Sequence, residues 1–87
     1  MKQEHQGYTV KLHGNSAVIY SDSTREVLVQ IEFVQEGRHE KVLVNSKKFF
    51  NPKDLRQPFG LGEDIRADVI SRIVQDLKAN NFDVEVI

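Results

Sequence analysis

The stretch "EVLVQIEFVQEGRHEKVLVN", Glu26–Asn45, decides the fold. It contains two runs rich in β-branched residues, the composition of β-strands, on either side of the turn signal "EGRH". Gly37 is well placed to open a tight type II′ hairpin, because glycine readily adopts the positive φ that this turn requires. We therefore predict two antiparallel strands, Glu26–Gln35 and Glu40–Asn45, joined at this turn.

Two shorter strands precede this hairpin. The run "YTVKLH", Tyr8–His13, alternates apolar and polar residues, which is the period of a half-buried strand. The run "AVIYS", Ala17–Ser21, follows after "GN", a two-residue hairpin signal. The next turn is "DST", because Asp and Ser side chains bond to their own main chain in turns. The four runs together predict an antiparallel meander.

The turns also predict which side chains share a face, because directly paired residues in antiparallel strands point to the same side. A two-residue turn after His13 pairs Leu12 with Ala17, and a three-residue turn at residues 22–24 brings Ile19 beside Val27. The predicted core face carries Tyr8, Val10, Leu12, Ala17, Ile19, Val27, Val29, Ile31, Phe33, Val42 and Val44. The predicted outer face carries Val18, Tyr20, Leu28, Val34 and Leu43 among polar residues.

The apolar residues of this outer face suggest an interface. A solvated face of an antiparallel sheet is usually more polar than this one, and contiguous apolar surface marks association sites. Isolated apolar residues are also common on surfaces, which is the alternative interpretation. We expect a partner protein or a second copy to contact Val18, Tyr20, Leu28, Val34 and Leu43.

The C-terminal part of the chain predicts one helix and one further strand. In "DIRADVISRIVQDLKANN" apolar residues recur at helical spacing, and Glu63 and Asp64 suit the positive end of the helix dipole. The run "FDVEVI", Phe82–Ile87, reads as the final strand. The prediction is an α+β two-layer sandwich, β-β-β-β-loop-α-β, with one helix on one face of a mostly antiparallel sheet. We expect a single domain over residues 1–87, with a flexible tail at residues 1–6.

The segment "SKKFFNPKDLRQPFGLGED", Ser46–Asp64, has no clear period, and its two prolines oppose both helix and strand. We predict a long loop over residues 46–63, and loops of this length are usually functional or packed by their own side chains. The segment is basic although the whole chain has a net charge of −1. We expect apolar side chains to anchor the loop while cations contact a partner. The candidate binding residues are Lys47, Lys48, Phe49, Phe50, Lys53, Arg56 and Phe59.

The sequence predicts no catalytic residue, metal site or cofactor. It contains no cysteine, its three histidines stand at no metal-ligand spacing, and no nucleophile, phosphate or dinucleotide fingerprint is present. No apolar run approaches the roughly 18 residues of a membrane helix, and the polar start "MKQEHQGY" does not read as a signal peptide. We therefore expect a cytoplasmic protein that is not an enzyme and does not enter a membrane.

The stretch "LRQPFGLGEDIRADVISRIVQDLKANNFDVEVI", Leu55–Ile87, resembles small bacterial proteins of immunity families in polymorphic toxin systems. The shared features are a Pro-containing loop, an acidic helix start, an Ile- and Leu-bearing helix and a closing "VEV" strand; the rest of the chain shares only the order of elements. Uncharacterised cassette-encoded bacterial proteins are similar. The chain departs from the pattern at Phe59 and in its basic loop. The resemblance implies binding and blocking of a cognate toxin without catalysis, and it assigns no binding residue.

Three functional hypotheses follow. The leading one is a non-catalytic protein-binding or inhibitory protein. The second is a single-stranded nucleic-acid module in which Phe49, Phe50 or Phe59 stacks on bases while the four cations of the loop hold phosphates. The negative net charge disfavours this second hypothesis. The third is a homodimeric structural protein.

Overall fold

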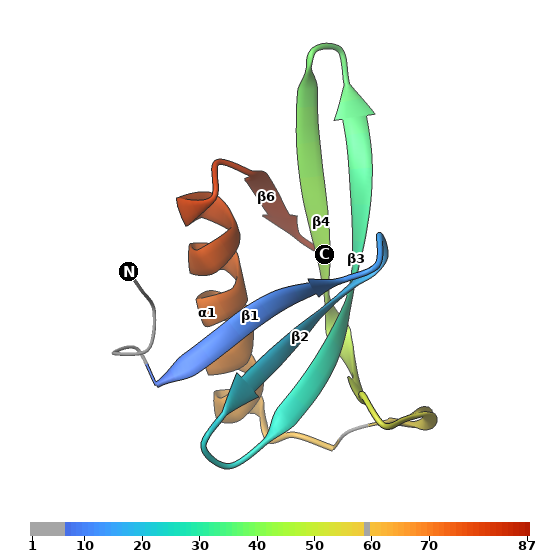
Figure 1. The fold of residues 1–87 in the computed structure, drawn as a ribbon, viewed down its shortest axis with the longest axis vertical. Helices are drawn as coiled ribbons and strands as arrows, with labels where there is room; N and C mark the ends of the chain where they lie inside the picture. Colours follow the sequence, from blue (N-terminus) through green and yellow to red (C-terminus); the bar gives the residue numbers. More distant parts are fainter. Residues whose placement is uncertain (1–6, 59) are drawn as a thin grey trace.

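The computed structural model describes residues 7–58 and 60–87, so the predicted tail and Phe59 lie outside the described residues (Figure 1). Over these residues the fold is α+β, as predicted, with one helix and a mostly antiparallel sheet. The elements are β1 (Tyr8–His13), β2 (Ala17–Asp22), β3 (Glu26–Glu36), β4 (His39–Asn51), β5 (Asp54–Pro58), α1 (Glu63–Ala79) and β6 (Asp83–Val86).

The first four strands form the predicted meander, in the order β1-β2-β3-β4 and antiparallel throughout. The far side of β4 is shared by two strands: β6 pairs with it in parallel along residues 41–44, and β5 pairs with its C-terminal end. Figure 1 shows the β3–β4 hairpin, drawn in green, extending well beyond the other strands of the sheet.

The hydrophobic core combines side chains of α1 with side chains from one face of the sheet, hereafter the inner face. Phe33, Val44, Ile73 and Val84 share one core: Val44 and Ile73 are fully buried, and the other two pack against the same cluster. Burying a side chain of this kind stabilises the fold by about 1.5–3 kcal/mol. The buried cluster consists of Val18, Tyr20, Val27, Val29, Ile31, Val42, Val44, Phe49, Val69, Ile70, Ile73 and Leu77.

The predicted register of β2 is wrong by one residue at each of its turns. Leu12 pairs with Val18, and Tyr20 pairs with Val27, so β2 is turned over relative to the prediction. Val18 and Tyr20 are therefore fully buried on the inner face and cannot belong to an outer-face interface, whereas Ala17 and Ile19 take the outer positions. Leu28, Val34 and Leu43 keep their predicted outer positions, but Leu28 is 5% exposed beside Phe50 and is not available to the predicted interface either.

The two errors have a physical cause. The first turn uses three residues, since His13 pairs with Ala17, and the second is closed by the Asp22 N–H donating to the Arg25 carbonyl. The first error shifts the pairing of β1 with β2 by one residue, and the second shifts the pairing of β2 with β3 by one residue. Strands β1 and β3 therefore keep their predicted faces, and β2 alone is turned over. Because the first four residues of β2 are all apolar or aromatic, the alternation that normally selects the buried face is missing.

The predicted long loop over residues 46–63 is also wrong in large part. The strand β4 continues through Asn51 and forms a short hairpin with β5. It does so across a bulge: Val29 pairs with Phe49 and Ile31 with Val44, positions that are two apart in β3 and five apart in β4. The extra residues switch the parity of β4, so that Phe49 enters the core.

Candidate functional site

The four cations of the predicted basic segment are exposed. Lys47 and Lys48 lie on the β4 bulge, Lys53 lies in the β4–β5 turn, and Arg56 lies on β5. Of these, Arg56 has an ion-pair partner among the described residues, the Asp54 carboxylate at 3.6 Å. The cations thus form an exposed basic surface, hereafter the basic hairpin.

The aromatic residues of that segment do not share this exposure. Phe49 is 2% exposed and belongs to the hydrophobic core, where the Arg66 guanidinium lies 6.0 Å from its ring centroid. Phe50 is half-buried on the opposite side of the strand, where it pairs with Leu28. Phe59 lies outside the described residues. Phe49 therefore anchors the segment and is not available to stack on a ligand.

The structure brings together a different site that the sequence did not predict, at the edge of β3. The strand β2 pairs with β3 over Glu26–Gln30, but β3 continues to Glu36. Beyond Ile31, whose N–H donates to the Ser16 carbonyl at 2.9 Å, no described strand pairs with this side of β3. Residues 32–36 thus form an open strand edge, hereafter the β3 edge.

The hydrogen-bonding groups of this edge follow from the ladder. In an antiparallel pair, successive residues direct their main-chain N–H and C=O groups to opposite sides. Ile31 directs its N–H away from β4, and its partner Val44 accepts a hydrogen bond from Ile87 on the far side of β4. Both hydrogen bonds show that Ile31 directs its main-chain groups away from β4. Every second residue of β3 does the same, so Phe33 and Gln35 also present their main-chain groups to the open side.

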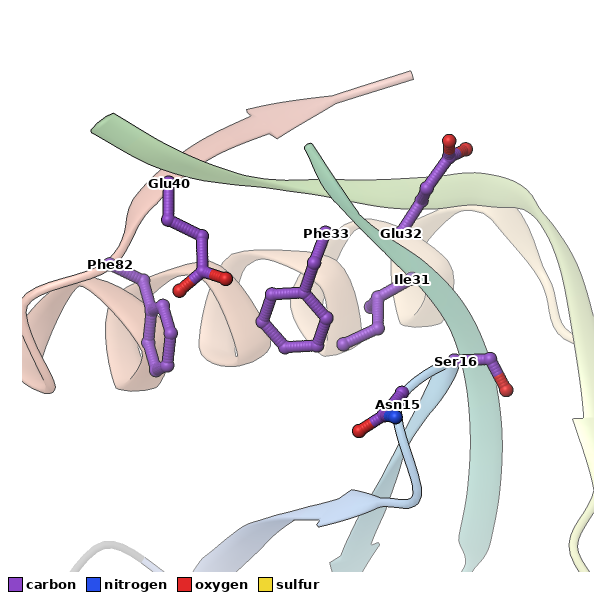
Figure 2. Close-up of a pocket in the computed structure, with 7 residues that line it drawn as sticks. All are labelled: Asn15, Ser16, Ile31, Glu32, Phe33, Glu40 and Phe82. Carbon is purple, nitrogen blue, oxygen red and sulfur yellow. The ribbon is translucent and has the colours of Figure 1, made fainter. Parts of the chain in front are cut away.

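A hollow of about 630 Å³ adjoins the β3 edge on the inner face of the sheet. Phe33 and Phe82 pack there with ring centroids 5.9 Å apart, and Figure 2 shows both rings and the Glu40 carboxylate directed into the same space. The hollow is lined by Asn15, Ser16, Ile31, Glu32, Phe33, Glu40 and Phe82. It is hereafter the inner hollow.

A second hollow of about 190 Å³ lies on the outer face, where it reaches from Ser16 and Glu32 across β4 to Ile87, hereafter the outer hollow. Ser16, Ile31 and Glu32 line both, because the β3 edge separates them. Leu43, an outer-face residue that the sequence offered for an interface, contributes apolar surface here together with Ile87. Neither hollow is lined by a described Lys or Arg, whereas Glu32 and Glu40 supply negative charge.

A polar network at the opposite end of the sheet holds α1 to β2. The Tyr20 hydroxyl donates to Asp22 Oδ2 at 2.8 Å and accepts a hydrogen bond from Arg72 Nη1 at 2.6 Å. Arg72 also lies over the Tyr8 ring, 5.1 Å from its centroid, and burial raises the pKa of Tyr20. The donors and acceptors satisfy one another, so we assign the network to structure.

Asp22 is the most strongly perturbed carboxyl group in this network. Burial by itself raises its pKa, but hydrogen bonds from the Thr24 N–H, the Tyr20 hydroxyl, the Thr24 hydroxyl and the Arg25 N–H together lower it to about 2. The same bonds close the β2–β3 turn.

The described residues contain no helix long and apolar enough to cross a membrane, and no group of three or more potential metal ligands. Comparison of the chain with protein-family models, with curated proteins and with solved structures finds no match in any of the three. The function is therefore inferred from the geometry of the molecule.

The sequence signal for the β3 edge is a difference in strand length. The predicted second strand has about half the length of the predicted third, and in the structure β2 has 6 residues while β3 has 11. A long strand beside a short neighbour leaves part of its edge unpaired unless another element covers it. The sequence alone therefore indicates this difference in strand length.

Proposed function

We propose that this chain is a non-catalytic protein-binding domain that takes up an extended segment of another protein at the β3 edge. The observation that carries the proposal is the open edge itself, which presents the main-chain groups of Phe33 and Gln35 to solvent between two hollows. Strand addition uses such edges: main-chain hydrogen bonds provide affinity, and alternate side chains in pockets provide specificity.

The length of the edge agrees with this mode of binding. On the side away from the open edge, residues 32–36 pair with β4 from Leu43 to His39, which fixes their extended conformation. An added strand would therefore meet a preformed template and lose less conformational entropy than if both partners had to order. A role as an inhibitor of a cognate toxin, as the immunity-type resemblance suggests, is a narrower form of the same proposal.

Two further expectations remain part of the proposal. The chain has no cysteine, and small secreted domains are commonly stapled by disulfides, which favours the cytoplasm as its location. Helix residues and inner-face strand residues share one hydrophobic cluster, which favours a two-layer arrangement. This packing would leave the β3 edge accessible at the rim of the sheet.

Single-stranded nucleic-acid binding is the second candidate function, because the cations of the basic hairpin are exposed. The burial of Phe49 counts against it, since stacking platforms for bases require accessible aromatic faces. We therefore favour the protein-binding proposal.

The variant Gln35→Pro tests the proposed site. Proline removes the N–H that Gln35 presents to the open side but breaks no bond to β4, and proline is tolerated on edge strands for this reason. A library of short random peptides displayed on phage is selected on immobilised wild type and counter-selected on the variant. An unfolding curve like that of wild type confirms that the variant is folded.

The proposal expects enriched peptides that bind wild type more tightly than the variant and that shift the NMR amide signals of Phe33 and Gln35. Two results would contradict it. One is a selection that enriches no peptide. The other is enrichment of peptides that bind both proteins equally and shift signals of Lys47 and Lys48 instead.

A further inference from the structure

We propose that the segment added at the β3 edge is basic, with a Lys or Arg side chain in the inner hollow and an apolar side chain next to it in the outer hollow. This inference rests on the proposed function, because it describes the chemistry of the partner at the same edge. The partner is an extended basic segment of another protein, and not an anionic or nucleic-acid ligand.

The placement of the two hollows matches the period of a β-strand. Successive side chains of a strand point to opposite faces of the sheet, and a neighbouring strand lies about 4.8 Å away. The hollows lie on opposite faces of one edge and share Ser16, Ile31 and Glu32. Consecutive residues of an added strand would therefore point in turn toward the inner hollow and toward the Glu32 side of the outer hollow.

The inner hollow has the chemistry of a site for a long cation. Phe33 and Phe82 offer aromatic surface for the methylene stem of Lys or Arg, which packs on apolar groups while its charge stays near water. Figure 2 shows the Glu40 carboxylate reaching toward the same space from β4, whereas the carboxylate of Glu32 points away from it. A cation seated between the rings and Glu40 gains both ion-pair and cation–π attraction.

The outer hollow suits a smaller apolar side chain. It has less than a third of the volume of the inner one, and Leu43 and Ile87 supply its apolar surface. Gln30, Asn45 and Glu32 form a polar rim around that surface. A Val or Ile side chain would cover the β3 side of this space without burying a charge.

A second copy of the chain is a poorer occupant of this edge. In the register centred on Val34, two antiparallel copies of β3 would place Glu32 of each opposite Glu36 of the other, and like charges directly opposite are destabilising, although Lys41 lies 3.3 Å from Glu36. Acidic residues at an edge also guard against unspecific edge-to-edge association. The same charges favour a basic partner, because complementary charge speeds encounter and rejects partners of the wrong sign.

The probe is a short peptide of alternating Lys and Val with blocked ends, titrated into the full chain and followed by NMR amide shifts and by calorimetry. The first control peptide replaces each Lys by Glu. The second keeps every side chain but carries N-methyl groups on alternate residues, which removes the donors that strand addition uses. Sedimentation of the chain alone reports any self-association.

The matched variants are Glu40→Gln and Glu26→Gln. Glu26 is an exposed carboxylate at the start of β3, at the end far from the β3 edge, so it controls for the loss of one negative charge. We expect Glu40→Gln to weaken binding of the Lys peptide about two- to fivefold, the range of a partly exposed ion pair, and Glu26→Gln to leave it within error. Glu40→Lys should reverse the preference and favour the Glu peptide.

The outcomes separate this inference from the function on which it rests. Binding of the Lys peptide at residues 32–36, loss with the N-methylated peptide and sensitivity to Glu40 support both. Binding at the same edge with equal affinity for the Lys and Glu peptides overturns the basic-partner inference but retains the edge as a site. No shift at residues 32–36 with any peptide, or a dimer formed through this edge, overturns both.

Discussion

The Nη1 of Arg72 on α1 lies 2.6 Å from the hydroxyl of Tyr20 on β2, across 52 positions of sequence. The hydroxyl itself is held by Asp22, and the Tyr20 side chain is fully buried. The contact therefore fixes the orientation of the only described helix against the strand whose register the sequence did not predict. The Tyr20 ring belongs to the core and its hydroxyl belongs to the polar network. The ring and the hydroxyl therefore contribute separately to the free energy of unfolding.

The variant Tyr20→Phe tests the polar part of this contact. It keeps the ring but leaves Arg72 and Asp22 without their shared partner, which should lower the free energy of unfolding by about 1–2 kcal/mol. The matched control is Tyr8→Phe, because Tyr8 stacks on Tyr20 through its ring. Urea unfolding should show a loss below about 0.5 kcal/mol for the control. Equal losses for the two variants would contradict the network.

The low pKa of Asp22 predicts a pH dependence of stability. Its folded pKa of about 2 lies below the ordinary value of 3.8, so its stabilising contribution is present above pH 3.8 and is lost as pH falls toward 2. After allowance for solvent screening, the contribution is on the order of 1–2 kcal/mol. Urea unfolding between about pH 2 and pH 6 should therefore show a flatter profile for Asp22→Asn than for wild type. The control variant is Asp83→Asn, which should follow the wild-type profile. A profile of Asp22→Asn that also runs parallel to that of wild type would contradict the stabilising role of Asp22.

Two valines test the register of β2. Val18 is fully buried on the inner face, whereas Val34 is half-buried on the outer face of β3. Val18→Ala removes core contacts and leaves a cavity, so we expect a loss of about 2–3 kcal/mol, against less than about 1 kcal/mol for Val34→Ala. The register predicted from sequence put both on one face and would give similar losses. Thermal or urea unfolding of the two variants decides between the registers.

Reversal of the basic hairpin tests the nucleic-acid alternative. Labelled single-stranded DNA and RNA are titrated against wild type and a variant with Glu at positions 47, 48, 53 and 56. We expect only weak, unspecific association for both proteins. Tight binding that the reversal abolishes, and that falls with salt at a log–log slope of roughly −0.7 per phosphate contact, would replace protein binding as the leading function.

The sequence was sufficient for the parts of the fold with strong alternation and defined turns. The hairpin of β3 and β4 has the predicted register, with Phe33 opposite Val42, because Gly37 adopts a φ of 61° at a two-residue turn. The helix was predictable because its apolar residues recur at helical spacing and its first turn is acidic. Local patterns and tertiary contacts agree in these segments.

The remaining parts depended on contacts between distant segments. The face of β2 was not predictable from an unbroken apolar run, and tertiary packing with α1 selected it. The path of β4 past Lys47 and Lys48 depended on a bulge opposite Gln30, which no local pattern marks. The inner hollow joins Phe82 to Phe33 only after β6 has paired with β4. Its partners are far apart in sequence, so composition alone could not place them.

The most direct test of the open β3 edge is the hydrogen exchange of four adjacent amides in the free chain. The structure directs the N–H groups of Glu32 and Val34 toward β4 and those of Phe33 and Gln35 toward the open side. We predict slow exchange at the first pair and fast exchange at the second, with the fast pair slowed when a strand-forming peptide binds. Equal protection of all four amides in the free protein would show that the β3 edge is already covered, and would contradict the account.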